Sequence, residues 1–137
     1  MRRPSELRLS CPAQSRYVAP IRHALAAFLE ALAFDNDLRD DVTTAAGEAL
    51  ANVVEHAYIS SSGKATRDLQ LLARVHSGGR LSVDVSDRGS FIRRKPLPGR
   101  GFGLRIIRAI ARKMSIDTSR GTCVSMTFEA PSTASKR

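Results

Sequence analysis

The sequence predicts an α/β protein built as a two-layer sandwich, in which a mostly antiparallel mixed sheet is covered by about three helices. Three observations support this fold class. Apolar residues recur at helical spacing in three segments of the chain. Short apolar alternations flank turn residues, as in β-hairpins. The length of 137 residues suits a single domain, here 1–137, with a sizeable core.

The first half of the chain predicts one strand and two helices. Residues 6 to 11 favour a short strand, and the apolar residues between Tyr17 and Leu32 follow a helical period. Asp35-Asn36-Asp37 interrupts this period and is suited to cap a second helix, which we expect from about Leu38 to Ala57.

The second half predicts two hairpins around a third helix. In chain order we expect strands at 69 to 75 and 81 to 85, a helix at 102 to 114, and strands at 115 to 118 and 122 to 129. The segment from 87 to 101 contains three glycines and two prolines and is expected to be a loop. Frayed ends are expected at 1 to 5 and 131 to 137.

The chain has a formal net charge of +9 and a pI near 10.7. Such a charge points to an acidic partner, which can be a nucleic acid, a nucleotide or a protein. The basic residues lie in several clusters, and only 5% of all residues are aromatic, so a base-stacking array is not predicted. A nucleic-acid-binding function rests on charge alone, and we expect no direct nucleic-acid partner.

The apolar stretches are too short to cross a membrane, and no apolar signal region follows the charged N-terminal residues. We therefore expect a cytoplasmic protein without a membrane partner. Cys11 and Cys123 are expected to be reduced thiols in strands, with a disulfide as the alternative. The three histidines are scattered, so their positions predict no metal cluster.

The helix expected over 38 to 57 carries Glu48 and Asn52 one turn apart, beside the edge of its apolar stripe. An acidic residue at such an edge is often merely solvated. As a functional residue, Glu48 is a carboxylate that orients or deprotonates an attacking hydroxyl. Asn52 would offer a side-chain oxygen to Mg²⁺, which prefers oxygen ligands. His56 and Tyr58 are expected to pack the end of this helix.

Asp87 and two groups of glycines complete the candidate site. Asp87 emerges from the end of a strand, where aspartate is commonly a turn former. Alternatively, its carboxylate accepts a hydrogen bond from the exocyclic amine of a purine, and Gly89 lets the backbone approach the base. Gly101-Phe102-Gly103 leads directly into a helix, whose first N–H groups can bind an anion; a flexible loop is the alternative.

Together these segments resemble the GHKL ATPase superfamily, and within it the anti-sigma-factor serine/threonine kinases of the RsbW and SpoIIAB type. The run from Thr44 to Tyr58 is similar to that family's N-box, and Asp87-Arg88-Gly89 to its adenine-binding turn. Residues 99 to 107 resemble its lid-end phosphate motif, and residues 121 to 126 its closing strand. The resemblance covers the chain from about residue 6 to residue 130.

The resemblance implies a Bergerat-type ATP-binding fold, with ATP and Mg²⁺ as cofactors. It also implies two protein partners: a sigma factor that the kinase blocks, and a STAS-domain anti-anti-sigma protein that it phosphorylates on serine. Such kinases dimerise through a sheet face, so a homodimer is an expectation by analogy.

The resemblance also assigns roles to residues. Glu48 corresponds to the catalytic carboxylate, and Asn52 to the Mg²⁺ ligand. The residues that correspond to nucleotide-binding positions are Asn52, Asp87, Gly89, Gly101, Gly103 and Thr122, of which the last three serve the phosphates. Arg22, on the first helix, aligns with a partner-contacting position; a solvated helix arginine is the alternative.

Two other interpretations compete with this resemblance. Ser90-Phe91 follows Gly89 where the family usually has a second glycine, which favours a non-catalytic partner-binding anti-sigma module with weak nucleotide binding. A histidine kinase catalytic domain shares the fold, but this chain has no room for a dimerisation helix pair.

Overall fold

The structure is a computed structural model that describes residues 5–57, 68–88 and 102–129. A five-stranded sheet forms one layer, and three α-helices form the other. The strands are β1 (Glu6–Pro12), β2 (Asp68–Val75), β3 (Arg80–Asp87), β4 (Lys113–Asp117) and β5 (Thr122–Glu129). The α-helices are α1 (Val18–Ala31), α2 (Asn36–Asn52) and α3 (Phe102–Ile110). The predicted two-layer sandwich is therefore confirmed.

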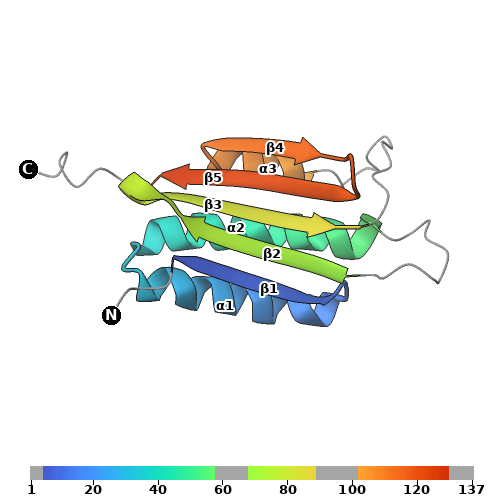
Figure 1. Ribbon diagram of the computed structural model, residues 1–137, viewed down its shortest axis with the longest axis horizontal. Helices are drawn as coiled ribbons and strands as arrows, with labels where there is room; N and C mark the ends of the chain where they lie inside the picture. The colour runs from blue at the N-terminus through green and yellow to red at the C-terminus, as the bar shows by residue number, and fades with distance from the viewer. Residues whose placement is uncertain (1–4, 58–67, 89–101, 130–137) are drawn as a thin grey trace, which may run out of the picture.

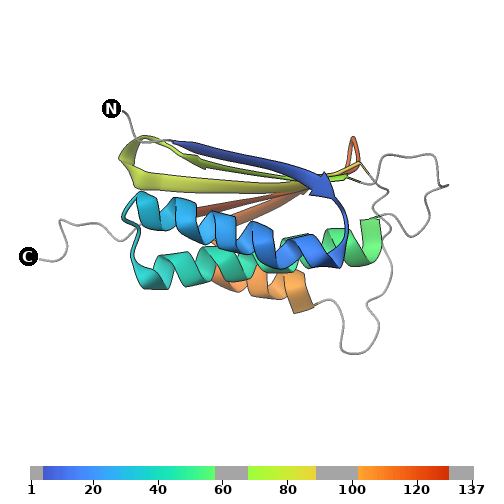
Figure 2. The same cartoon turned by 90° about the horizontal axis from the view of Figure 1, so that it is seen from below.

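The sheet has the strand order β1-β2-β3-β5-β4, and each of its four pairings is antiparallel. No parallel pair occurs among the described strands, so the sheet is antiparallel throughout and not mixed. All three helices lie on the same side of the sheet, and α2 lies between α1 and α3 (Figures 1 and 2). The last residue of β3, Asp87, is paired with the first residue of β5, Thr122.

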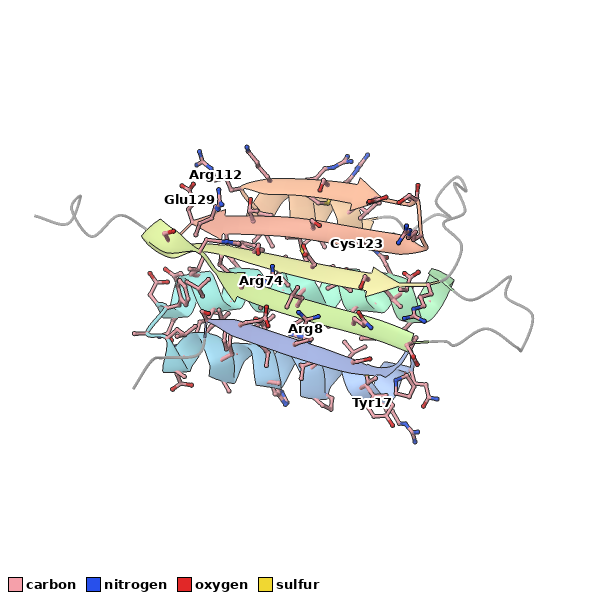
Figure 3. All side chains as sticks on the ribbon, viewed as in Figure 1. Arg8, Tyr17, Arg74, Arg112, Cys123 and Glu129 are labelled. Carbon is pink, nitrogen blue, oxygen red and sulfur yellow. The ribbon has the colours of Figure 1, made fainter. Side chains whose placement is uncertain are left out.

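The sheet has one apolar and one polar face because side chains alternate along each strand. In β3, Leu81, Val83 and Val85 are buried under the helices, and the residues between them are polar and less buried. The opposite face carries charged side chains, including Arg8 and Arg74, which both pair with Glu6 (Figure 3). The core consequently lies between the helices and one face of the sheet.

The turn between α1 and α2 is set by Asp35, as the sequence predicted. The Asp35 Oδ1 atom accepts a hydrogen bond from the Leu38 backbone N–H at 2.8 Å, which caps the first turn of α2. Helix α2 is regular up to Asn52, and a π-helical turn over Val53–Ala57 follows. The predicted single helix to Ala57 therefore changes its winding immediately after Asn52. Such π-turns are frequent at functional sites.

Helix α3 ends at Ile110, and the prediction that it reaches Met114 was wrong. The Ala111 N–H still donates to the Ile107 carbonyl, but the Arg112 N–H donates to Thr127 of β5 at 2.8 Å. Lys113 and Met114 then pair with β5 as the first residues of β4. Backbone pairing with the neighbouring strand thus replaces the last helical turn. Arg112 also forms an ion pair with Glu129 (Figure 3).

Cys11 and Cys123 are free thiols in β1 and β5, two strands that β2 and β3 separate. In the part of the chain that the structure describes, none of the helices is long and apolar enough to cross a membrane.

Candidate functional site

Two residues of α2 and the start of α3 form the centre of the candidate site. A β-carbon built on Gly103 would lie 3.1 Å from Glu48 Oε2, and 3.5 and 3.6 Å from Asn52 Nδ2 and Oδ1. The polar ends of both predicted side chains therefore converge on the one residue of α3 that has no side chain. The sequence predicted all three residues, and the structure brings them together.

Small residues along α2 make this approach between the helices possible. Ala45 and Ala49 are completely buried on the face of α2 that packs in the core, and Glu48 and Asn52 are half-buried at its edge. Gly103 is the second residue of α3, where backbone N–H groups have no partner within the helix. The carboxylate of Glu48 and the amide of Asn52 thus lie where a helix terminus favours an anion.

Asp87 forms a second group with Thr122. It is only 7% exposed, and it is the only buried charged residue in the described part of the chain. The Thr122 backbone N–H donates to Asp87 Oδ1 at 3.2 Å. This hydrogen bond places Thr122 beside Asp87, whereas the resemblance assigned Thr122 to the phosphates. The phosphate-binding role of Thr122 stays a prediction.

The two groups lie at the same end of the molecule. Figure 1 shows β3 ending and β5 beginning at the right-hand side, where α2 also ends. The side chains of Asp87 and Asn52 come from these element ends, one in each layer. A ligand bound between the ends of the layers would therefore meet a buried carboxylate on the sheet side and the Glu48-Asn52-Gly103 group on the helix side.

Arg22 lies close to this end as well. A β-carbon on Gly47 would lie 3.1 Å from Arg22 Cδ and 3.2 Å from Arg22 Nε, so the arginine stem passes over the glycine that precedes Glu48. Arg22 itself is exposed on α1. Arg22 thus lies on the α1 side of α2, whereas the Glu48 carboxylate lies on the side of α2 that faces α3. The role of Arg22 in partner contact stays a prediction.

Two residues of the site were not predicted as functional from the sequence. Gly47 and Gly121 each leave room for another part of the chain, Arg22 in one case and Asp87 in the other. A glycine inside a helical pattern, such as Gly47, is a known signal of close packing and could have been used. Of the predicted residues, Gly89 and Gly101 lie outside the described residues, as do Tyr58 and the side chain of His56.

A metal ion held by protein alone and a magnesium nucleotide place different requirements on the described residues. These residues contain no group of three or more His, Cys, Asp or Glu side chains that could hold a metal ion. Mg²⁺ needs no such cluster, because it keeps several waters and binds through one or two protein oxygens and the phosphates of a substrate. The Asn52 amide, which lies close to Gly103, is the side chain that would offer such an oxygen.

The model of the histidine kinase-like ATPase domain family matches residues 11–128 of this chain. The chain belongs to this family. The ATPase fold implies that it uses ATP. Its relatives include the serine-protein kinase RsbW of two Bacillus cereus strains, at 31% and 30% identity, and each alignment covers 93% of this chain and 86% of the relative. The resemblance to RsbW-type anti-sigma kinases is therefore confirmed.

Solved structures of low sequence identity share the fold. The RsbU and RsbW domains of a Mycobacterium tuberculosis protein superpose with a TM-score of 0.75 at 20% identity, over 93% of this chain. This chain spans only 33% of that longer structure. The SiaB-SiaC complex from Pseudomonas aeruginosa gives a TM-score of 0.69 at 16% identity, and the match covers 89% of this chain and 88% of the other. The two-layer architecture of this chain is thus shared with both solved structures.

Proposed function

We propose that this ATPase-family protein is an ATP-dependent protein serine kinase and anti-sigma factor that acts in the cytoplasm. Its substrate would be a STAS-domain anti-anti-sigma protein, phosphorylated on serine, and its second partner a sigma factor. The relatives named serine-protein kinase RsbW support the kinase activity. The position of Gly103 against Glu48 and Asn52 is the observation that carries the proposal, because it unites a candidate base, a candidate Mg²⁺ ligand and a helix start.

The nucleotide would be held from both layers. Asp87 would accept a hydrogen bond from the adenine amine, and Gly89 would allow the base to approach the backbone. Gly101, Gly103 and Thr122 would surround the phosphates, with Gly103 offering the N–H groups of the first turn of α3. Asn52 would bind Mg²⁺ through its side-chain oxygen. When bound, magnesium ATP supplies the phosphoryl group and neutralises the charge that develops during its transfer.

Glu48 would orient the serine hydroxyl of the protein substrate and accept its proton at Oε2. Phosphoryl transfer depends mainly on positioning and charge neutralisation, so a single well-placed carboxylate is sufficient as the base. Glu48 Oε2 lies close to the backbone of Gly103, in a contact too tight for a side chain larger than glycine's to fit without movement. The reacting hydroxyl would therefore reach the carboxylate from the side of the bound phosphates.

Charge supports the choice of protein partners. With a net charge of +9, the chain would attract proteins that present acidic surfaces, and this attraction would speed their association. Arg22 is exposed on α1 beside Gly47 and would contact the substrate protein directly. Arginine is enriched among the residues that contribute most to protein interfaces. Binding of a sigma factor and a STAS-domain protein to the same surface would make the two partners compete.

Two measurements test the proposal. Calorimetric titration with ATP and Mg²⁺ should show binding by the wild-type chain and none by Asp87→Asn. Transfer of labelled phosphate from ATP to the STAS-domain proteins of the source organism, purified in turn, should modify at least one of them on serine. In Glu48→Gln this transfer should fall by about 10²- to 10⁴-fold while ATP binding persists. Glu30→Gln is the matched control, because Glu30 is an exposed glutamate in the last turn of α1 and not part of the candidate site.

The alternative is a partner-binding module without catalysis, and the sequence departure at Ser90-Phe91 favours it. It predicts that the chain binds a STAS-domain protein and a sigma factor in turn, without phosphate incorporation and with weak nucleotide binding. If purified complexes form but no labelled phosphate appears on either partner, the kinase proposal is wrong and the module is the better description.

A further inference from the structure

Gly121, in the turn between β4 and β5, lies against the backbone at the end of β3. Its φ angle is +81°, a conformation that glycine adopts without steric penalty. A β-carbon on Gly121 would lie 2.1 Å from the Asp87 carbonyl oxygen and 2.7 Å from Arg88 Cα. Both atoms belong to the backbone, so a side chain at this position cannot be accommodated by a rotamer change. The end of β3 or the turn itself would have to move.

Gly121 is the neighbour in sequence of the residue that hydrogen-bonds to the Asp87 side chain. Thr122 follows Gly121 in the chain and begins β5, and its N–H donates to Asp87 Oδ1. In the register of the sheet, Asp87 is opposite Thr122. The sheet register and the Gly121 turn together set where the Thr122 donor meets the carboxylate. Because a backbone N–H donates and never accepts, it holds that carboxylate oxygen as an acceptor in one orientation.

The other glycines with positive φ provide a contrast. Gly78 and Gly79, in the turn between β2 and β3, have φ angles of +84° and +83°. A β-carbon on either would meet no atom within 4 Å. These positions therefore need glycine for backbone conformation alone. Position 121 requires glycine for its backbone conformation and, in addition, because a β-carbon there would clash with the backbone of Asp87.

We propose that Gly121 is a positioning residue for base recognition, which sets the Asp87 carboxylate so that the protein prefers adenine over guanine nucleotides. This inference rests on the proposed role of Asp87 as the adenine-reading residue. Adenine presents an amine to a carboxylate acceptor at the position where guanine presents a carbonyl oxygen, which a carboxylate repels. The preference depends on the direction of the carboxylate, because hydrogen bonds weaken steeply when their angle is poor.

The test compares ATP and GTP binding by titration calorimetry in the wild type, Gly121→Ala, Gly79→Ala and Asp87→Asn. The alanine at Gly79 introduces the same backbone strain without a clash, so this variant should keep the wild-type affinities for both nucleotides. Gly121→Ala should lose about tenfold or more in ATP affinity, and its ratio of GTP to ATP dissociation constants should fall toward one. A loss of stability alone would not change this ratio in the folded protein.

The outcomes separate the two proposals. If Asp87→Asn binds ATP like the wild type, the assignment of Asp87 to adenine is wrong. If Asp87→Asn loses binding but Gly121→Ala keeps the wild-type ratio, only the positioning role of Gly121 is wrong. Should Gly121→Ala not fold, Thr122→Pro removes the same donor at the first residue of a strand, where proline is tolerated. An unchanged nucleotide ratio in that variant would equally overturn the inference.

Discussion

Gly103, at the start of α3, faces the carboxylate of Glu48 on α2: a β-carbon on the glycine would lie 3.1 Å from Glu48 Oε2. This separation is shorter than most contacts that a real β-carbon makes. The space beside the proposed base therefore depends on the absence of a side chain at one position of the neighbouring helix. We therefore expect function and stability to place opposite demands on that position.

Gly103→Ala should separate these demands. Alanine in a helix is more stable than glycine by roughly 0.5–1 kcal/mol, so the melting temperature should stay equal or rise. The added methyl group should displace the Glu48 carboxylate by a few tenths of an ångström, and phosphate transfer should fall by about tenfold. Thermal unfolding and labelled-phosphate transfer on the same preparation provide both readings. Full transfer in a stabilised variant would show that the Glu48 carboxylate tolerates a side chain there.

Arg22→Ala should weaken binding of the STAS-domain partner by roughly tenfold, because the exposed guanidinium beside Gly47 would contact it. Affinity for ATP should stay at the wild-type value. Arg8→Ala is the matched control, since it removes the same charge from the opposite face of the sheet (Figure 3). Surface plasmon resonance with the immobilised partner measures both variants. Equal losses in the two variants would indicate a general charge effect instead of a contact at Arg22.

Asp35→Ala should lower the free energy of unfolding by about 1 kcal/mol, because it removes the acceptor of the Leu38 N–H at the start of α2. For a domain of this size the melting temperature should fall by roughly 2–4 °C. Asp35→Asn should retain most of the stability, since asparagine caps helices about as well as aspartate. Urea unfolding of both variants is the measurement. Equal destabilisation by alanine and asparagine would assign the effect to charge and not to the cap.

The two thiols should react slowly with alkylating reagents near neutral pH. Burial raises the pKa of Cys123, an effect that the hydrogen bond with Ser125 partly offsets, and burial also raises the pKa of Cys11. A raised pKa leaves less thiolate, the reactive form, at any given pH. The alkylation rate should therefore keep rising beyond the pH at which an unperturbed thiol levels off. Cys11→Ser and Cys123→Ser resolve the two rates by mass spectrometry, and levelling off at the ordinary thiol pKa would contradict the expectation.

Local sequence signals predicted the elements of this fold and part of its site. Asp35 marks the start of α2, and the helical period places Glu48 and Asn52 at one edge of that helix. The alternation in β3 places Asp87 at the end of a buried strand. These predictions succeeded because capping, helical period and strand alternation depend only on residues that are close in sequence.

The sequence by itself thus determined which helices and strands form and which polar residues lie at their edges. Only the tertiary structure decided that Gly103 faces Glu48, that Gly121 lies against Asp87, and that the Arg112 N–H bonds to β5 instead of extending α3. These contacts depend on the strand order and on the packing of α3 against α2, which join residues distant in the chain. Local propensity contains no information about such pairings, and at the end of α3 the hydrogen bonds of the sheet outweighed it.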